Sequence, residues 1–161
     1  MSSPTGEIPS AARDASRLTE PARRVVRTEV VDAPLDVAEH AALVSDAAAG
    51  AVVTFAGVVR DHDCGRGVER LRYVGHPSAP DVLRAVAADV AARCRVDAVA
   101  VSHRLGDLEV GDCALAVAVS AAHRHEAFAA AALLVDEVKR LLPVWKHQHF
   151  ADGTREWVAS P

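Results

Sequence analysis

The chain has 161 residues, of which 50% are hydrophobic and 25% charged, and its net charge is −4 at pH 7. These values fit a soluble globular domain, and the acidic net charge argues against general binding of nucleic acid. No apolar run approaches the roughly 18 residues of a membrane span. The odd number of cysteines, three, and the absence of a signal-peptide core predict a reducing, cytoplasmic location.

Residues 1–24 mix Ser, Pro, Arg and acidic residues without periodicity, which predicts a disordered N-terminal tail before one domain over residues 25–161. Alternation and helical spacing then predict the following order: strand 25–31, helix 35–49, strand 51–59, loop 60–67, strand 68–74, helix 81–94, strand 96–105, strand 113–120, a helix from 123 to Pro143, an extended segment from 145, and a hairpin at 152–153 returning through 155–158.

The predicted strand 113–120 is apolar on both faces, because Leu115, Val117 and Val119 alternate with alanines. Such a strand lies in the centre of a sheet that is covered on both sides. We expect a helix on one face, and a second subunit is one candidate for the other. Two of the three cysteines lie in apolar surroundings and are predicted to be core thiols, whereas Cys64 lies in a polar loop.

The segment from His123 to Lys146 gives the strongest indication of a functional site. Lys139 and Lys146 are the only lysines, although Lys and Arg together number 18. This bias suggests that lysine stands where a compact ammonium that can lose its proton is needed. His123 and Arg124 fall where a strand leads into a helix N-terminus, and the unpaired amides there favour an anion.

Some of these residues also allow purely structural interpretations. His123 and Arg124 could simply cap the helix, although a cation there opposes the helix dipole. Lys139 falls on the same row of the helix as an apolar stripe, and it could form a solvated ion pair with Asp136. The stripe consists of Phe128, Ala132, Val135 and Leu142.

Three other histidines leave alternatives open. His103 shares a strand face with valines, so a buried or interface histidine is as consistent with the pattern as a ligand contact. His147 and His149 alternate as a pair of metal ligands would, but two ligands are too few. The sequence therefore predicts no metal site.

Over residues 50–158 the chain resembles the large, catalytic subunit of molybdopterin synthase. The motifs that carry the resemblance are Phe55-x-Gly57-x-x-Arg60, His103-Arg104-x-Gly106 with Gly111, His123-Arg124-x-Glu126-Ala127-Phe128, Asp136-x-x-Lys139, Pro143-x-Trp145-Lys146, and Gly153 with Trp157-Val158. The resemblance implies an α+β fold, an α/β hammerhead-like domain with a small additional β-region. It also implies a homodimer flanked by two ubiquitin-like sulfur carriers, which together form a heterotetramer.

The implied reaction converts cyclic pyranopterin monophosphate to molybdopterin, with sulfur supplied by the thiocarboxylate at the carrier's C-terminus. Such a site must hold two anions together, which Arg, His and Lys side chains can do without a cofactor. By position, the resemblance assigns catalysis to Lys139 and Lys146. It assigns substrate binding to Phe55, Arg60, His123 and Arg124, with His103 and Arg104 as further candidates.

Two departures from the family pattern leave alternatives. The segment Leu71-Arg72-Tyr73-Val74-Gly75-His76 lacks the usual Glu after Tyr, and His147-Gln148 replaces a basic residue and Glu after Trp-Lys. Loss of the second carboxylate could change the proton affinity of Lys146 or the carrier contact. The alternatives are a homologue that docks the carrier without catalysis, and a sulfur carrier that uses Cys64.

Overall fold

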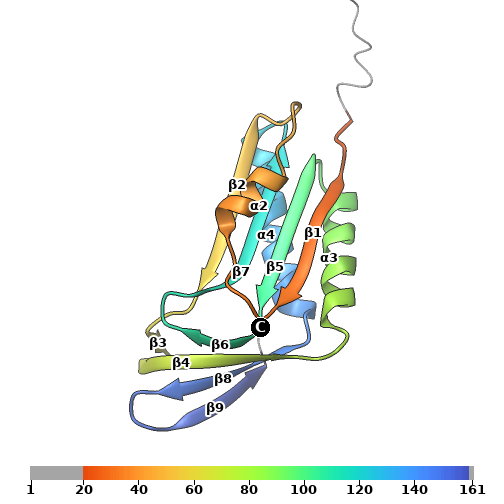
Figure 1. The fold of residues 1–161 in the computed structure, drawn as a ribbon. Coiled ribbons are helices and arrows are strands. Elements are labelled where there is room, and N and C mark those ends of the chain that lie inside the picture. The colour runs from red at the N-terminus through yellow and green to blue at the C-terminus, as the bar shows by residue number, and fades with distance from the viewer. Residues whose placement is uncertain (1–19, 160–161) are drawn as a thin grey trace, which may run out of the picture.

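The computed structural model describes residues 20–159, which form three helices and two sheets (Figure 1). The predicted α+β class with an additional β-region is confirmed. The helices are Val37–Leu43 (α2), Ala79–Arg93 (α3) and Arg124–Leu141 (α4). The strands are Arg24–Val31 (β1), Ala51–Val58 (β2), His62–Asp63 (β3), Arg66–Gly75 (β4), Ala98–Arg104 (β5), Gly106–Glu109 (β6), Cys113–Ala121 (β7), Val144–Phe150 (β8) and Arg155–Ala159 (β9).

The first sheet has four strands in the order β1-β5-β7-β2, with β1 parallel to β5 and the other pairs antiparallel. Strands β5 and β7 lie in its centre and are buried at nearly every position. Helices α3 and α4 cover one face. The larger side chains of β5 and β7 pack there, as their alternation predicts: Val99, Val101, Leu115, Val117 and Val119.

Helix α2 covers part of the other face, where β5 and β7 present alanines. His40 of α2 is only 2% exposed, and its two ring nitrogens lie 2.6 Å from the carbonyl oxygen of Asp36 and 2.7 Å from Oγ of Ser102 in β5. The bond to Ser102 joins the helix to the sheet, and the bond to the N-cap residue Asp36 orients the ring. The chain's own helix α2, rather than a second subunit, therefore covers this part of the sheet.

The second sheet has the order β3-β4-β8-β9, and β6 pairs with the free side of β4. It lies below the first sheet, at the end where β1, β2 and β5 finish (Figure 1). Along β4, Leu71 is buried and Tyr73 partly buried, while Arg70 and Arg72 are exposed. Leu71 joins Val59 and buried residues of β6 and β7 in a small core that connects the two sheets.

Several predicted boundaries differ from the structure. Helix α2 is shorter than predicted because Asp36 caps it, accepting from the amides of Ala38 and Glu39, and it ends at Leu43 rather than near residue 49. The predicted loop 60–67 contains the β3–β4 hairpin, and the segment after β5 contains β6. Both missed strands are too short to show a periodic pattern.

The start of the domain lies slightly before the predicted boundary. The amides of Arg23 and Arg24 donate to the carbonyl oxygens of Val96 and Asp97, at 3.0 and 2.9 Å. The last two residues of the predicted tail are therefore held against the first sheet, and residues 1–19 of that tail lie outside the described residues. None of the helices between residues 20 and 159 is long and apolar enough to cross a membrane.

Candidate active site

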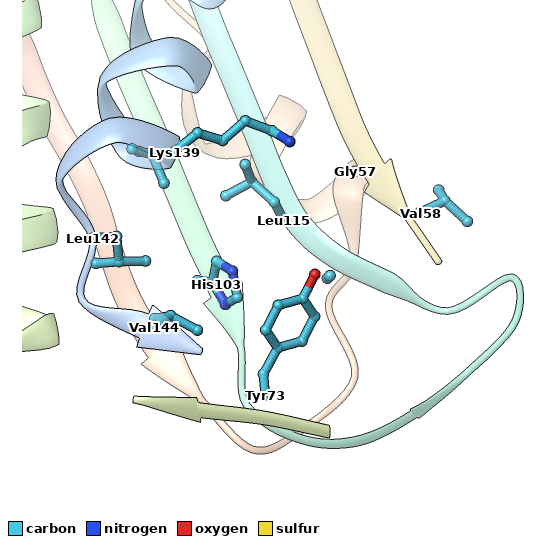
Figure 2. A pocket seen from close by; sticks show the side chains of 10 residues that line it. Gly57, Val58, Tyr73, His103, Leu115, Lys139, Leu142 and Val144 are labelled. Carbon is cyan, nitrogen blue, oxygen red and sulfur yellow. The ribbon is translucent and has the colours of Figure 1, made fainter. Parts of the chain in front are cut away.

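A small cavity of about 100 Å³ lies where the end of α4 meets both sheets (Figure 2). Its walls come from β2, β4, β5, β7, β8 and the last turn of α4. The lining residues are Gly57, Val58, Tyr73, His103, Ala114, Leu115, Val138, Lys139, Leu142 and Val144. Three of them carry ionisable groups: Tyr73, His103 and Lys139.

Lys139 lies one residue beyond the buried face of α4, in the helix's last turn. The predicted apolar stripe is wrong in part: Val135 and Leu142 are buried, but Phe128 is 62% exposed and Ala132 is also exposed. The residues that pack on the sheet are Ala127, Ala130, Ala131, Leu134, Val135 and Val138. Lys139 and Asp136 form no ion pair, so the structural alternative for Lys139 is not supported. The lysine stands at the edge of the core and lines the cavity.

His103 is a neutral, buried member of the cavity wall. Only 6% of the residue is exposed, and its Nδ1 lies 2.8 Å from the carbonyl oxygen of Arg104, so Nδ1 carries the proton and donates. Burial lowers the pKa of His103 to about 4, and the positive charge of Lys139 acts in the same direction. The imidazole is therefore uncharged at neutral pH.

Tyr73 packs edge-on against His103, with ring centroids 5.0 Å apart. Burial raises the pKa of its phenol, which stays protonated at neutral pH and can donate a hydrogen bond. Sequence reasoning noted Tyr73 only as part of a departure from the family pattern. The alternation of exposed arginines with Leu71 and Tyr73 along β4 could have indicated that Tyr73 faces inward.

Lys146 lies on β8 directly opposite Tyr73 of β4. Residues directly opposite each other in an antiparallel pair have side chains on the same face, so Tyr73 links the two lysines: Lys139 shares the cavity with it, and Lys146 is its cross-strand neighbour. Near Lys146, the Arg60 guanidinium lies 3.4 Å from Asp63. A hydrogen bond from Gln148 lowers the pKa of Asp63 most, and the charges of Lys146 and Arg60 lower it further. The structure thus brings Arg60 and both lysines to one end of the molecule.

Phe55 and Arg104 lie near the cavity but do not line it. Phe55 of β2 is partly buried, and its ring edge lies 3.3 Å from where a Cβ on Gly57 would stand. Arg104 follows His103 on β5 and points to the other side of the strand, where its guanidinium lies 3.5 Å from Asp112. Of this consecutive pair, only His103 lines the cavity.

His123 and Arg124 lie at the opposite end of α4. Both are exposed, and His123 occupies the N-cap position without forming a side-chain capping bond. From Arg124 to Lys139 the helix rises about 22 Å, at 1.5 Å per residue. One copy of the chain therefore does not bring these two predicted substrate-binding residues to the cavity.

Among residues 20–159, no group of three or more His, Cys, Asp or Glu side chains is arranged to hold a metal ion. His147 and His149 contact each other, and His147 stacks on Trp157 with ring centroids 4.3 Å apart. The residues gathered at the cavity, by contrast, are cationic or neutral donors. They suit an anionic group with an oxygen or sulfur that gains negative charge during a reaction.

Comparison with known proteins agrees with this chemistry. Residues 30–141 match the family model of the MoaE protein. This chain belongs to the MoaE family. The molybdopterin synthase catalytic subunit of Nostoc sp. is 41% identical over 129 residues, which cover 79% of this chain and 78% of the relative. The prediction that this chain is a molybdopterin synthase catalytic subunit is therefore confirmed.

Solved structures support the same assignment of the fold. Molybdopterin synthase from Staphylococcus aureus is 28% identical, with a TM-score of 0.76, and the match covers 82% of this chain and 96% of that one. A protein–protein complex of subunits 1 and 2 of the molybdopterin-converting factor from Helicobacter pylori shares the fold at 18% identity and a TM-score of 0.61, over 81% of this chain and 88% of that one.

Proposed function

We propose that the cavity beside Lys139 receives the extended C-terminal tail of a small ubiquitin-like carrier, whose thiocarboxylate supplies sulfur to a pyranopterin phosphate. The observation that supports this is the position of the chain's only two lysines around Tyr73: Lys139 lines the cavity with it, and Lys146 lies opposite it on β8. A cavity of about 100 Å³ is far smaller than the roughly 300–1,000 Å³ of pockets that enclose drug-sized ligands. It suits an unbranched tail and leaves the pterin outside it.

The two lysines would then act on different atoms of the carrier's terminal group. The Lys139 ammonium stabilises negative charge that develops on the carbonyl oxygen when the sulfur is transferred. His103 is neutral and adds no charge of its own, while the protonated phenol of Tyr73 supplies a hydrogen bond. Lys146 and Arg60 attract the anionic groups of the tail and the pterin. Each carrier gives up one sulfur and leaves as a carboxylate, with the replacing oxygen drawn from water.

We further propose that the site is completed by a second copy of the chain, in a homodimer that binds two carriers. His123 and Arg124 lie about 22 Å from Lys139 along α4, so they reach a substrate at the cavity only from another subunit. The edge strand β2 and the neighbouring helix expose apolar side chains that a dimer would cover: Val52 (49%), Val58 (48%) and Phe128 (62%).

The function is tested by mixing the purified protein with thiocarboxylated carrier and cyclic pyranopterin monophosphate, and measuring sulfur incorporation by mass spectrometry. We expect a product that contains both sulfurs. Carrier binding without any transfer would instead show a docking homologue. Because Cys64 is exposed and outside the cavity lining, Cys64→Ser should keep the wild-type rate, whereas a Cys64-based carrier would lose it.

The shared site is tested by mixing two inactive variants, Lys139→Ala and Arg124→Ala. If the subunits re-associate at random, about half of the dimers are mixed, and each mixed dimer has one intact site, so about a quarter of the wild-type rate should return. Each variant alone serves as the control. A mixture that stays inactive after verified subunit exchange would place both residues in the same site of one chain.

A further inference from the structure

Asp63 contacts both Arg60 and the strand that carries Lys146. It lies on β3, and its Oδ2 accepts a hydrogen bond of 2.7 Å from Nε2 of Gln148 on β8. Its other oxygen, Oδ1, lies 3.4 Å from Nη2 of Arg60. Gln148 is only 2% exposed, so its amide has left water and depends on partners within the protein. The carboxylate therefore connects β3, β8 and the segment before the hairpin.

The β3–β4 hairpin holds Asp63 in place. Asp63 pairs with Arg66, and the two residues between them, Cys64 and Gly65, have positive φ angles of 48° and 75°. This is the backbone of a two-residue turn whose twist matches that of the strands it joins. The carboxylate is thus presented by a short, constrained turn to a residue 85 positions away in the sequence.

Asp63 is also placed to act on Lys146. Lys146 and Gln148 are two residues apart on β8, so their side chains leave the same face of the strand. The hydrogen bond from Gln148 lowers the pKa of Asp63 most, and the positive charges of Lys146 and Arg60 lower it further. The carboxylate is ionised at neutral pH and acts electrostatically on both cations, which would otherwise repel each other.

We propose that Asp63 is a positioning residue, whose carboxylate holds the Arg60 guanidinium and the Lys146 ammonium together so that they bind one anionic carrier tail. The proposal rests on the proposed function. It also explains the departure at position 148: the carboxylate that the family pattern has two residues after Lys146 is replaced by an amide, and Asp63 supplies a carboxylate to that amide from the hairpin.

The test compares Asp63→Asn with the double variant Asp63→Asn/Gln148→Glu, in the complex of full-length protein and thiocarboxylated carrier. Removing the charge should lower kcat for sulfur transfer by about 10- to 100-fold, because small displacements of a positioned group cost rates of that order. The double variant puts the carboxylate on the other partner of the same hydrogen bond. We expect it to restore most of kcat.

Asp61→Asn is the matched control. Asp61 is an exposed aspartate just before β3, and its side chain bonds only its neighbour His62 in the described structure. This variant should keep the wild-type rate. A normal rate in Asp63→Asn would overturn the proposal. So would failure of the double variant to regain activity while both variants melt at the wild-type temperature. A wild-type protein that transfers no sulfur would overturn the proposed function itself.

Discussion

The two sheets differ in what their strands expose. In the first sheet, β5 and β7 are buried almost throughout, while β4 and β8 of the second sheet alternate between buried and exposed residues. The outer face of the second sheet forms an open groove whose lining includes Arg70, Arg72, His147, His149 and Arg155. A sheet covered with apolar side chains on both faces has little room for charge, so the ionisable groups of the site come from its margins.

This difference separates stability from chemistry. The first sheet and its helices should determine whether the protein folds, and the margin where β4, β8 and the end of α4 meet should determine whether it reacts. Substitutions in the two regions should therefore affect different measurements.

The largest effect is expected for Leu134→Ala, which leaves a cavity between α4 and the first sheet. Leu134 is completely buried, and truncating such a residue costs about 2–5 kcal/mol of unfolding free energy. Urea denaturation should show this loss, while sulfur transfer per folded molecule stays normal. Leu141→Ala is the control on the same helix, because Leu141 is 43% exposed. A loss below about 1 kcal/mol for Leu134→Ala would mean that the sheet is not the scaffold assumed here.

The next effect is expected for Lys139, and it concerns rate. Lys139→Ala should lower sulfur transfer by about 10²–10³-fold, as removal of one preorganised charge from a reaction site typically does. Lys139→Arg should be nearly as damaging, because the planar guanidinium is larger than an ammonium and cannot take the same position in a cavity of about 100 Å³. Both variants should melt like the wild type. Arg140→Ala, an exposed neighbour paired with Glu137, is the control. A largely active Lys139→Arg would show that any positive charge at this position suffices and that the compact shape of the ammonium is not required.

A third effect should link the two regions through pH. His103 has a pKa of about 4 in the folded protein, below its ordinary value of 6.5, so the unfolded chain binds more protons between these values. The contribution of the neutral histidine to the unfolding free energy is fully present above pH 6.5 and is lost as the pH falls toward 4. The loss approaches about 3 kcal/mol, at 1.36 kcal/mol per pKa unit.

Unfolding free energies at pH 7 and pH 4.5 measure this contribution. His103→Gln cannot take up a proton in this range, so it should lose less stability on acidification than the wild type. Carboxylates protonate in both proteins and cancel in the comparison. Equal losses in the two proteins would show that His103 is not the buried neutral group described here.

The smallest effect concerns the edge of the first sheet. A chain that starts at residue 25 lacks the two backbone hydrogen bonds that Arg23 and Arg24 donate, whereas one that starts at residue 20 keeps them. At about 1 kcal/mol per hydrogen bond, the shorter chain should be less stable by about 2 kcal/mol. Its melting temperature should be lower by about 4–8 °C. Equal melting temperatures would show that β1 begins after Arg24.

Much of the fold could be predicted because valine and leucine alternate clearly along the buried strands. The stripe predicted on α4 is only half correct for a related reason: the helix carries alanine on several sides, so the pattern favours burial of the larger Phe128, which is 62% exposed. Alanine contributes too little contrast to identify a helix face. The short strands β3 and β6 gave no periodic signal at all.

The site was predictable only in part. The rarity of lysine pointed to Lys139 and Lys146, and both lie near Tyr73. The contact between Asp63 and Gln148 joins residues 85 positions apart, and no local pattern reveals such a pair. The separation of Lys139 from His123 and Arg124 has a different origin. One helix joins them, and its length keeps its two ends about 22 Å apart although they belong to one motif-rich segment.

Cys64 makes the β3–β4 turn experimentally accessible. It is the exposed one of the three cysteines, whereas Cys94 and Cys113 are partly buried, and burial raises the pKa of both of those thiols. Because the thiolate is the reactive form, a maleimide dye at neutral pH should attach to Cys64 first. The dye would sit one residue from Asp63. Stopped-flow fluorescence could then measure the rate of carrier binding separately from the rate of the sulfur transfer that follows. Lys139 and Lys146 would both remain unchanged in this experiment.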